Sequence, residues 1–201
     1  MAERPSARAG DGTPRRARDT QWRRVLCAVA ALTLVPRALP TQTSPPKEYQ
    51  LKAVFLFNFA QFVEWPVTAL PDPRAPLVIC ILGKDPFGSY LDETVRGETV
   101  NNHPLTVQRH GRVDEITTCH ILFVSQSEEG RLGRILAALK GRSILTVGDG
   151  EGFATRGGMI RFVTEKNRIR LRINLAAAEA DSLKISSKLL RPAEIVSPPR
   201  E

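Results

Sequence analysis

The sequence contains few of the residues that bind metals or carry out catalysis. It has only three histidines and three cysteines, which are His103, His110, His120, Cys27, Cys80 and Cys119. None of them falls in an HxxxH, HExxH or CxxC pattern, so the sequence predicts no metal site. There is no GxSxG nucleophile elbow and no GxGxxG loop, and GDGEG at 148–152 is best explained as a plain turn. We therefore expect no catalytic residues, no cofactor and no enzymatic activity.

Clustered positive charge is also scarce outside the N-terminal segment. The net charge is +8, but residues 1–47 hold nine of the Lys and Arg residues against three acidic ones. The remaining residues, 48–201, hold 20 basic and 18 acidic side chains. A nucleic-acid-binding surface needs clustered cations, so this balance argues against a nucleic-acid partner.

A long apolar run is missing as well. The longest candidate near the N-terminus, VLCAVAALTLVP, is shorter than the roughly 20 residues that a membrane-spanning helix needs. It follows an Arg-rich stretch and precedes ALPTQTSPP, which is the pattern of a secretory signal peptide. We expect a signal peptide at 1–40, a linker at 41–47, a folded domain at 48–196 and a disordered tail at 197–201. The alternative is an N-terminal anchor that is retained.

Removal of the signal peptide would leave two cysteines, Cys80 and Cys119. In an exported protein this even count fits one disulfide. Both cysteines also lie beside apolar, β-rich runs, which fits two buried free thiols equally well. The residues alone leave these two possibilities open.

What the sequence does have is a concentration of aromatics at 49–66, YQLKAVFLFNFAQFVEWP. Six of the twelve aromatic residues lie here, spaced largely at helical intervals. Polar residues such as Lys52 and Gln61 interrupt it, so we interpret it as a core helix that ends at Pro66. Whether Trp65 packs inward or is available to a partner stays open.

Strands and helices then alternate along the chain. Apolar, β-branched segments predict strands at 77–83, 105–109, 120–125, 143–149, 159–164 and 168–174. Helical periodicity or capping signals predict helices at 87–95, around 132–139, at 176–181 and at 186–190. This order predicts an α/β layered sandwich. Its central sheet would have about five to six mostly parallel strands flanked by helices, with one antiparallel pair near 159–174.

Several long segments together resemble the YfiR family of periplasmic regulators along residues 48–196. They are KAVFLFNFAQFVEWP, VICILGKDPFGSYLDE, CHILFVSQSE, ILTVGDGEGFATRGGMIRFV and RIRLRINLAAAEADSLKISSKLLRPAEIV. The resemblance implies a periplasmic α/β sandwich that forms homodimers. It also implies a partner, the periplasmic sensing domain of a membrane-bound diguanylate cyclase, whose cyclic-di-GMP synthesis the protein represses.

The resemblance also assigns residues. It implies a disulfide between Cys80 and Cys119. Some family members have a second pair of cysteines flanking the GGM motif, which is residues 157–159 here. In this sequence those positions are Ala154 and Arg161. The family's partner-facing segment implies partner binding at Ile160 and Arg172, although simple core packing explains Ile160 as well.

Two further expectations concern the signal that the protein receives. Reduction of the bridge would loosen the strand pairing near Cys119 and release inhibition, which makes redox state a candidate input. The alternative function is a periplasmic small-molecule sensor or binding protein. Its pocket would lie beyond the strand ends, beside loops such as 83–87 and 148–157.

Overall fold

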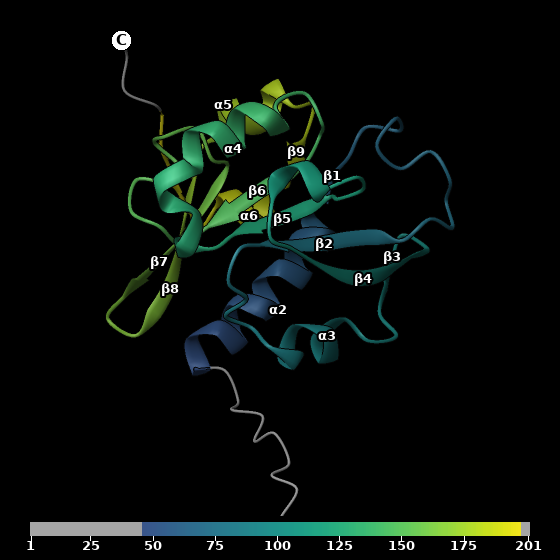
Figure 1. The fold of residues 1–201 in the computed structure, drawn as a ribbon, viewed down its shortest axis with the longest axis horizontal. Helices are drawn as coiled ribbons and strands as arrows, with labels where there is room; N and C mark the ends of the chain where they lie inside the picture. The colour runs from purple at the N-terminus through teal and green to yellow at the C-terminus, as the bar shows by residue number, and fades with distance from the viewer. Residues whose placement is uncertain (1–45, 198–201) are drawn as a thin grey trace, which may run out of the picture. The chain divides into compact units, whose positions relative to one another are not determined.

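The computed structural model describes residues 46–197 (Figure 1). The predicted signal peptide at 1–40, residues 41–45 of the predicted linker and residues 198–201 of the predicted tail lie outside the described residues. In the described part, every helix is too short or too polar to cross a bilayer.

Helices and strands alternate along this part of the chain. The helices are α2 (Lys47–Phe62), α3 (Ser89–Val95), η1 (Val113–Glu115), η2 (Gln126–Arg131), α4 (Leu132–Leu139), α5 (Leu175–Ala180) and α6 (Ser187–Leu190), where η denotes a 3₁₀ helix. The longer strands are β2 (Leu77–Leu82), β4 (His103–His110), β5 (Ile121–Val124), β6 (Leu145–Gly148), β7 (Ile160–Glu165) and β8 (Arg168–Ile173). Four two-residue strands are β1 (Val63–Glu64), β3 (Thr99–Val100), β9 (Lys184–Ile185) and β10 (Glu194–Ile195).

The central sheet has the order β10-β8-β7-β6-β5-β2-β4-β3. Only the β7–β8 and β3–β4 pairs are antiparallel, so the predicted mostly parallel α/β sheet is confirmed. The predicted strand count of five to six is exceeded because β3 and β10 also join the sheet. A two-residue strand has no periodicity, so its pairing partner alone reveals it.

Both faces of the sheet are covered, which explains the continuously apolar strands. In β2, Ile79 and Ile81 pack in a core that also contains residues of α2 and α3. Cys80 and Leu82 point to the other face and pack with the apolar stripe of α4. Figure 1 shows α2 and α3 on one side of β2 and β5, and α4 on the other.

The aromatic-rich segment forms α2, but the helix ends earlier than predicted. Val63 already has extended backbone angles, and β1 pairs antiparallel with β9, with Val63 opposite Ile185. The predicted end at Pro66 was therefore wrong. A β-branched residue favours extended backbone, and the pairing with a strand 122 residues later supplies hydrogen bonds that a local pattern does not reveal.

Candidate functional site

Cys80 and Cys119 are joined by a disulfide, with their Cα atoms 6.0 Å apart. Cys80 lies in the middle of β2, and Cys119 lies two residues before the start of the neighbouring strand, β5. Both are buried against the α4 side of the sheet. The bridge that the family resemblance implies therefore fastens the connection between β4 and β5 to the centre of the sheet.

Two arginines hold the same connection from the α4 side. Arg142 donates from Nη2 to the carbonyl oxygens of Ile116 and Thr117, at 2.7 and 3.2 Å. Arg131 donates from Nη2 to the carbonyl oxygen of Gly111, at 3.0 Å. Residues 111–119 are thus fixed at both ends and near the middle.

Ile160 is fully buried at the start of β7. Its neighbours across the sheet are Val147 on β6 and Ile173 on β8. The side chain belongs to the core on the α2 side of the sheet, so the structure agrees with core packing. Its predicted part in partner binding stays a prediction, and it can act there only by positioning neighbouring residues.

Arg172 lies on β8, on the opposite face of the same hairpin. The antiparallel register places Arg172 opposite Arg161 and Arg168 opposite Glu165, while Arg170 faces Val163. Directly opposite residues in an antiparallel pair share one face. Arg161, Arg168, Arg170 and Arg172 therefore form one surface, which we name the arginine face. Figure 1 shows the β7–β8 hairpin extending from the body of the sheet.

The carboxylates near this face balance only part of its charge. Arg172 donates from Nε to Glu194 at 2.8 Å, and its Nη2 lies 3.8 Å from Glu165. The side chains of Arg168 and Arg170 are exposed and have no ion pair or hydrogen bond within residues 46–197. Like charges directly opposite each other destabilise a strand pair, and Glu194 and Glu165 offset the charge of Arg172 but leave the four arginines of the face in excess. The face is therefore suited to an acidic partner.

The GGM segment that leads into β7 is shaped by one aromatic ring. Gly157 has a φ of +104°, a conformation that side chains rarely adopt. A Cβ atom on Gly158 would lie 2.2 Å from the ring of Phe153. The two glycines thus allow the chain to turn tightly around Phe153 before the hairpin begins. Ala154 is buried nearby, and its carbonyl accepts a hydrogen bond from Asn174 at 3.0 Å.

A buried ion pair lies where α2 passes the carboxyl end of β6. Lys52 Nζ is 2.7 Å from Asp149 Oδ2, and both side chains are 3% exposed. The hydroxyl of Tyr49 donates to the same carboxylate oxygen at 2.8 Å, and Glu48 lies 2.6 Å from Lys52. Burial, followed by the hydrogen bond to Asp149, raises the pKa of Tyr49, so the phenol stays protonated. Asp149 Oδ1 is buried and has no hydrogen-bond partner among the residues that the structure describes.

Sequence reasoning missed this cluster and treated GDGEG as a plain turn. The available signal was Lys52 itself, since it lies on the apolar stripe of the helix and a buried lysine needs a counter-ion. The counter-ion lies 97 residues away, so only the fold identifies it as Asp149. The cluster fixes the first turns of α2 over the sheet.

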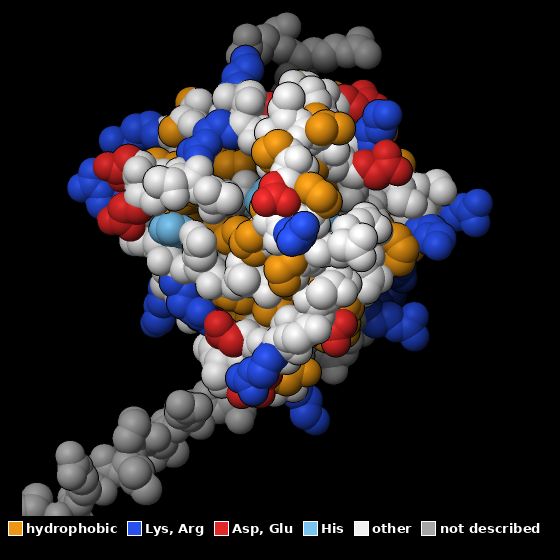
Figure 2. All heavy atoms as spheres, turned by 90° about the vertical axis from the view of Figure 1, so that its right-hand side faces the viewer, with side chains coloured by type: hydrophobic (Ala, Val, Ile, Leu, Met, Phe, Trp, Pro, Cys, Tyr) orange, Lys and Arg blue, Asp and Glu red, His pale blue; other side chains and the backbone are white. Residues whose placement is uncertain are grey.

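Trp65 is half-buried and packs partly inward, while its availability to a partner stays open. Its Nε1 donates to the carbonyl oxygen of His120 at 3.2 Å, which anchors the ring. The residue also lines a groove of about 620 Å³ with Pro66, Val67 and Leu183, and Val67 is 81% exposed. Figure 2, seen from the right-hand side of Figure 1, shows apolar side chains over the middle of this face, with acidic and basic side chains both among them and toward the rim.

Two of the histidines have structural hydrogen bonds. The backbone N–H of Val78 donates to Nδ1 of His120 at 2.9 Å, so Nε2 carries the proton and faces the Ala69 carbonyl at 3.2 Å. Nδ1 of His103 is 2.8 Å from the Ala75 carbonyl. Among residues 46–197, no three His, Cys, Asp or Glu side chains gather closely enough to hold a metal ion.

Comparison with known protein families identifies a relationship. The model of a family described as YfiR/HmsC-like matches residues 49–194. This range includes both cysteines, the GGM segment and the arginine face. No curated protein matches the sequence.

Proposed function

The chain belongs to the YfiR/HmsC-like family, and on this basis we propose that it represses a membrane-bound diguanylate cyclase. Family members are periplasmic regulators of diguanylate cyclase signalling and are not catalytic. The finer proposal is that this protein, exported after removal of residues 1–40, binds the cyclase's periplasmic domain as a homodimer. Binding lowers cyclic-di-GMP synthesis in the cytoplasm.

One observation carries the choice of binding surface, namely the excess of positive charge on the arginine face. Arg161 and Arg172 lie directly opposite each other, and the buried Nε of Arg161 has no hydrogen-bond partner within the described residues. An acidic patch on the cyclase domain would offset this repulsion and would also speed association. Arg172 then contacts the partner, and Ile160 keeps the hairpin in the register that directs Arg172 outward.

The physical mechanism is a shift between two states of the cyclase. A protein outside the membrane cannot touch the cytoplasmic active site, so it must bind one state of the outer domain more tightly than the other. A coupling of about 1–3 kcal/mol changes an equilibrium roughly 5- to 150-fold. Tighter binding to the inactive state of the cyclase therefore suffices for strong repression.

Redox state is part of the proposal as an input. The disulfide lies on β2 and the arginine face on β7 and β8, with β5 and β6 between them. Reduction would free Cys119 from β2 and so loosen the packing of α4, which covers the strands in between. Inhibition would then weaken because the arginine face is held less rigidly.

Charge reversal at Arg170 tests the binding surface. Arg170 is exposed and has no partner within residues 46–197, so Arg170→Glu should leave the fold intact. Membranes from cells that produce a tagged protein would be solubilised, and the cyclase captured with it would be quantified. We expect Arg170→Glu to lower capture at least about tenfold, because like charges would then meet, and to raise cellular cyclic-di-GMP.

Arg96→Glu is the matched control, since Arg96 is also exposed and unpaired in the described structure but follows α3. It should behave like the unmodified protein. Equal capture of the cyclase by both variants would contradict the arginine face as the binding surface. If the unmodified protein captures no diguanylate cyclase, the proposed partner is wrong.

A further inference from the structure

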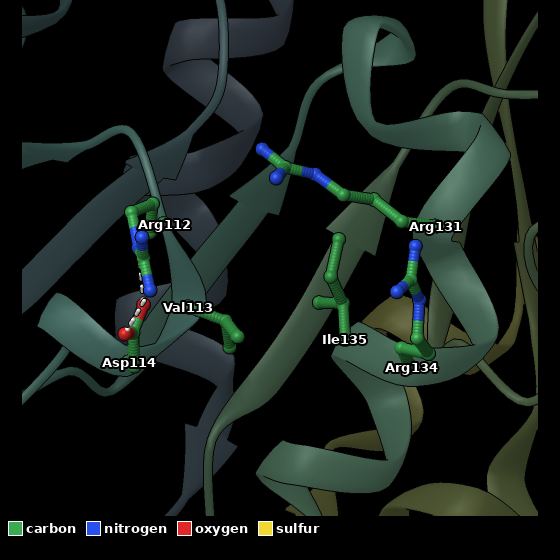
Figure 3. Close-up of a pocket in the computed structure, with 6 residues that line it drawn as sticks. All are labelled: Arg112, Val113, Asp114, Arg131, Arg134 and Ile135. Carbon is green, nitrogen blue, oxygen red and sulfur yellow. Dashed lines mark hydrogen bonds and ion pairs between the residues drawn. The ribbon is translucent and has the colours of Figure 1, made fainter.

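A cleft of about 460 Å³ opens between the β4–β5 connection and α4. Arg112, Val113 and Asp114 line one wall, and Arg131, Arg134 and Ile135 line the other. Figure 3 shows Arg131 reaching across the hollow toward the 112–114 segment, with the side chains of Val113 and Ile135 between the walls. The volume falls within the range of about 300–1,000 Å³ that is typical of small-molecule sites.

The three guanidinium groups of the cleft differ in their partners. Arg112 donates from Nε to Asp114 at 2.9 Å, and Arg131 forms an ion pair with the buried carboxylate of Glu128. The side chain of Arg134 is exposed and has no ion pair or hydrogen bond in the described part of the chain. One positive charge in the cleft is therefore left without a counter-ion.

The arginines on the two walls, Arg112 and Arg131, each have a carboxylate partner. The hydrogen bond from Arg131 to Glu128 raises the pKa of Arg131, while the positive charge of Arg112 acts in the opposite direction across the cleft. Glu115 does not fill the space, because its Oε2 accepts hydrogen bonds from the backbone N–H groups of Gly111 and Arg112. An anion in the cleft would be attracted mainly by Arg134, because Asp114 and Glu128 already offset the charges of Arg112 and Arg131.

The cleft is held in shape without any ligand. Ile135 is nearly fully buried and belongs to the core that contains the disulfide, and Val113 packs against that core. The Arg131 bond to Gly111 links the two walls directly. A preformed site of this kind loses little conformational entropy when a ligand binds.

We propose that this cleft binds a small organic monoanion, with its carboxylate at Arg134 and its apolar body against Val113 and Ile135. One uncompensated guanidinium favours one negative charge, whereas a phosphate dianion would need a second free cation. The apolar base favours an aryl or alkyl carboxylate over a small inorganic ion. The site differs from the arginine face, and its existence does not depend on the cyclase partner.

The sequence predicted a ligand pocket beyond the strand ends, beside loops such as 83–87 and 148–157. The hollow beside Gly150 and Phe153 is only about 10 Å³, which is too small for an organic ligand. The Arg134 cleft instead lies between the segments that follow β4 and β5. It gives the alternative function, small-molecule sensing, a specific site.

Titration of the ¹⁵N-labelled mature protein with phenylacetate, followed by NMR, tests the proposal. We expect saturable shifts in the backbone amides of residues 112–114 and 131–135. Acetate, which lacks an apolar body, and inorganic phosphate should shift them less at equal concentration. Benzylamine has the same ring but a positive charge, and it should leave them unchanged.

Arg134→Gln should weaken phenylacetate binding about fivefold, the effect of one exposed ion pair. Arg134→Lys keeps the charge and should largely retain binding, and Arg96→Gln is the control for an exposed arginine elsewhere. The proposal is overturned if phenylacetate shifts none of these amides at millimolar concentrations. It is also overturned if benzylamine shifts them equally, or if Arg134→Gln and Arg96→Gln bind alike.

Discussion

The disulfide should account for a large part of the domain's stability. Cys80 and Cys119 are 39 residues apart in sequence, so the bridge restricts a long loop in the unfolded chain. The loop-entropy relation gives about 4 kcal/mol for a loop of this length, and measured values are typically about 2–4 kcal/mol. A domain with a total stability of about 5–15 kcal/mol would lose a substantial fraction of it on reduction.

Urea unfolding of oxidised and reduced protein measures this contribution. With a slope of about 2 kcal/mol per molar urea, we expect the midpoint to fall by roughly 1–2 M on reduction. Because both sulfur atoms are buried, the protein should be reduced while unfolded and refolded with reductant present. The double variant Cys80→Ala, Cys119→Ala is the control, and reductant should not change its midpoint.

Two results would count against this reasoning. Equal midpoints for oxidised and reduced protein would show that the bridge does not restrict the unfolded chain as calculated. The redox proposal has a separate test in cells that produce the double variant at normal abundance. If their cyclic-di-GMP equals that of cells with the unmodified protein, redox input would be excluded even if the stability prediction holds.

Three further changes test other parts of the structure. Burial lowers the pKa of His120 below its ordinary value of 6.5, and the hydrogen bond to Ala69 acts against this shift. Around this pH the unfolded state therefore binds more protons than the folded state. The free energy of unfolding should fall as the pH drops below about 6.5. Urea midpoints between pH 7.5 and 5 would show this slope, and His120→Asn should flatten it. Gly158→Ala would force its methyl group into the Phe153 ring and should cost at least about 1–3 kcal/mol by the same assay, whereas no loss would disprove the close packing. Lys52→Met would leave the carboxylate of Asp149 buried without its cation and should cost about 3–5 kcal/mol, and Asp149→Asn in the same background should recover part of the loss.

The elements of the fold were largely predictable because their signals are local. The apolar β2 and β5 segments predicted strands that are covered on both faces, and the stripe of α4 predicted the helix that covers one of them. The end of α2 was not predictable in this way. Val63 is extended because β9 pairs with it, and no window of sequence around Val63 contains that information.

The candidate sites also differ in whether local sequence signals or only the tertiary structure reveals them. The cysteine pair could be named from the sequence and the family resemblance, since their number and type limit the choices. The arginine face needed the register of β7 and β8, because only the register places Arg161 opposite Arg172. The Arg134 cleft needed the packing of α4 against the β4–β5 connection, which brings together residues about 20 positions apart.

By itself, the sequence determined the alternation of strands and helices, the absence of a metal-ligand pattern, the two cysteines and the family. These features follow from residue type and short-range spacing, which can be identified without knowing the fold. The tertiary structure alone decided which charges meet. Lys52 pairs with Asp149, Arg172 faces Arg161, and Arg134 has no counter-ion among residues 46–197. The physical reason is that Coulomb interactions depend on distance and burial, and both are set by how distant segments pack.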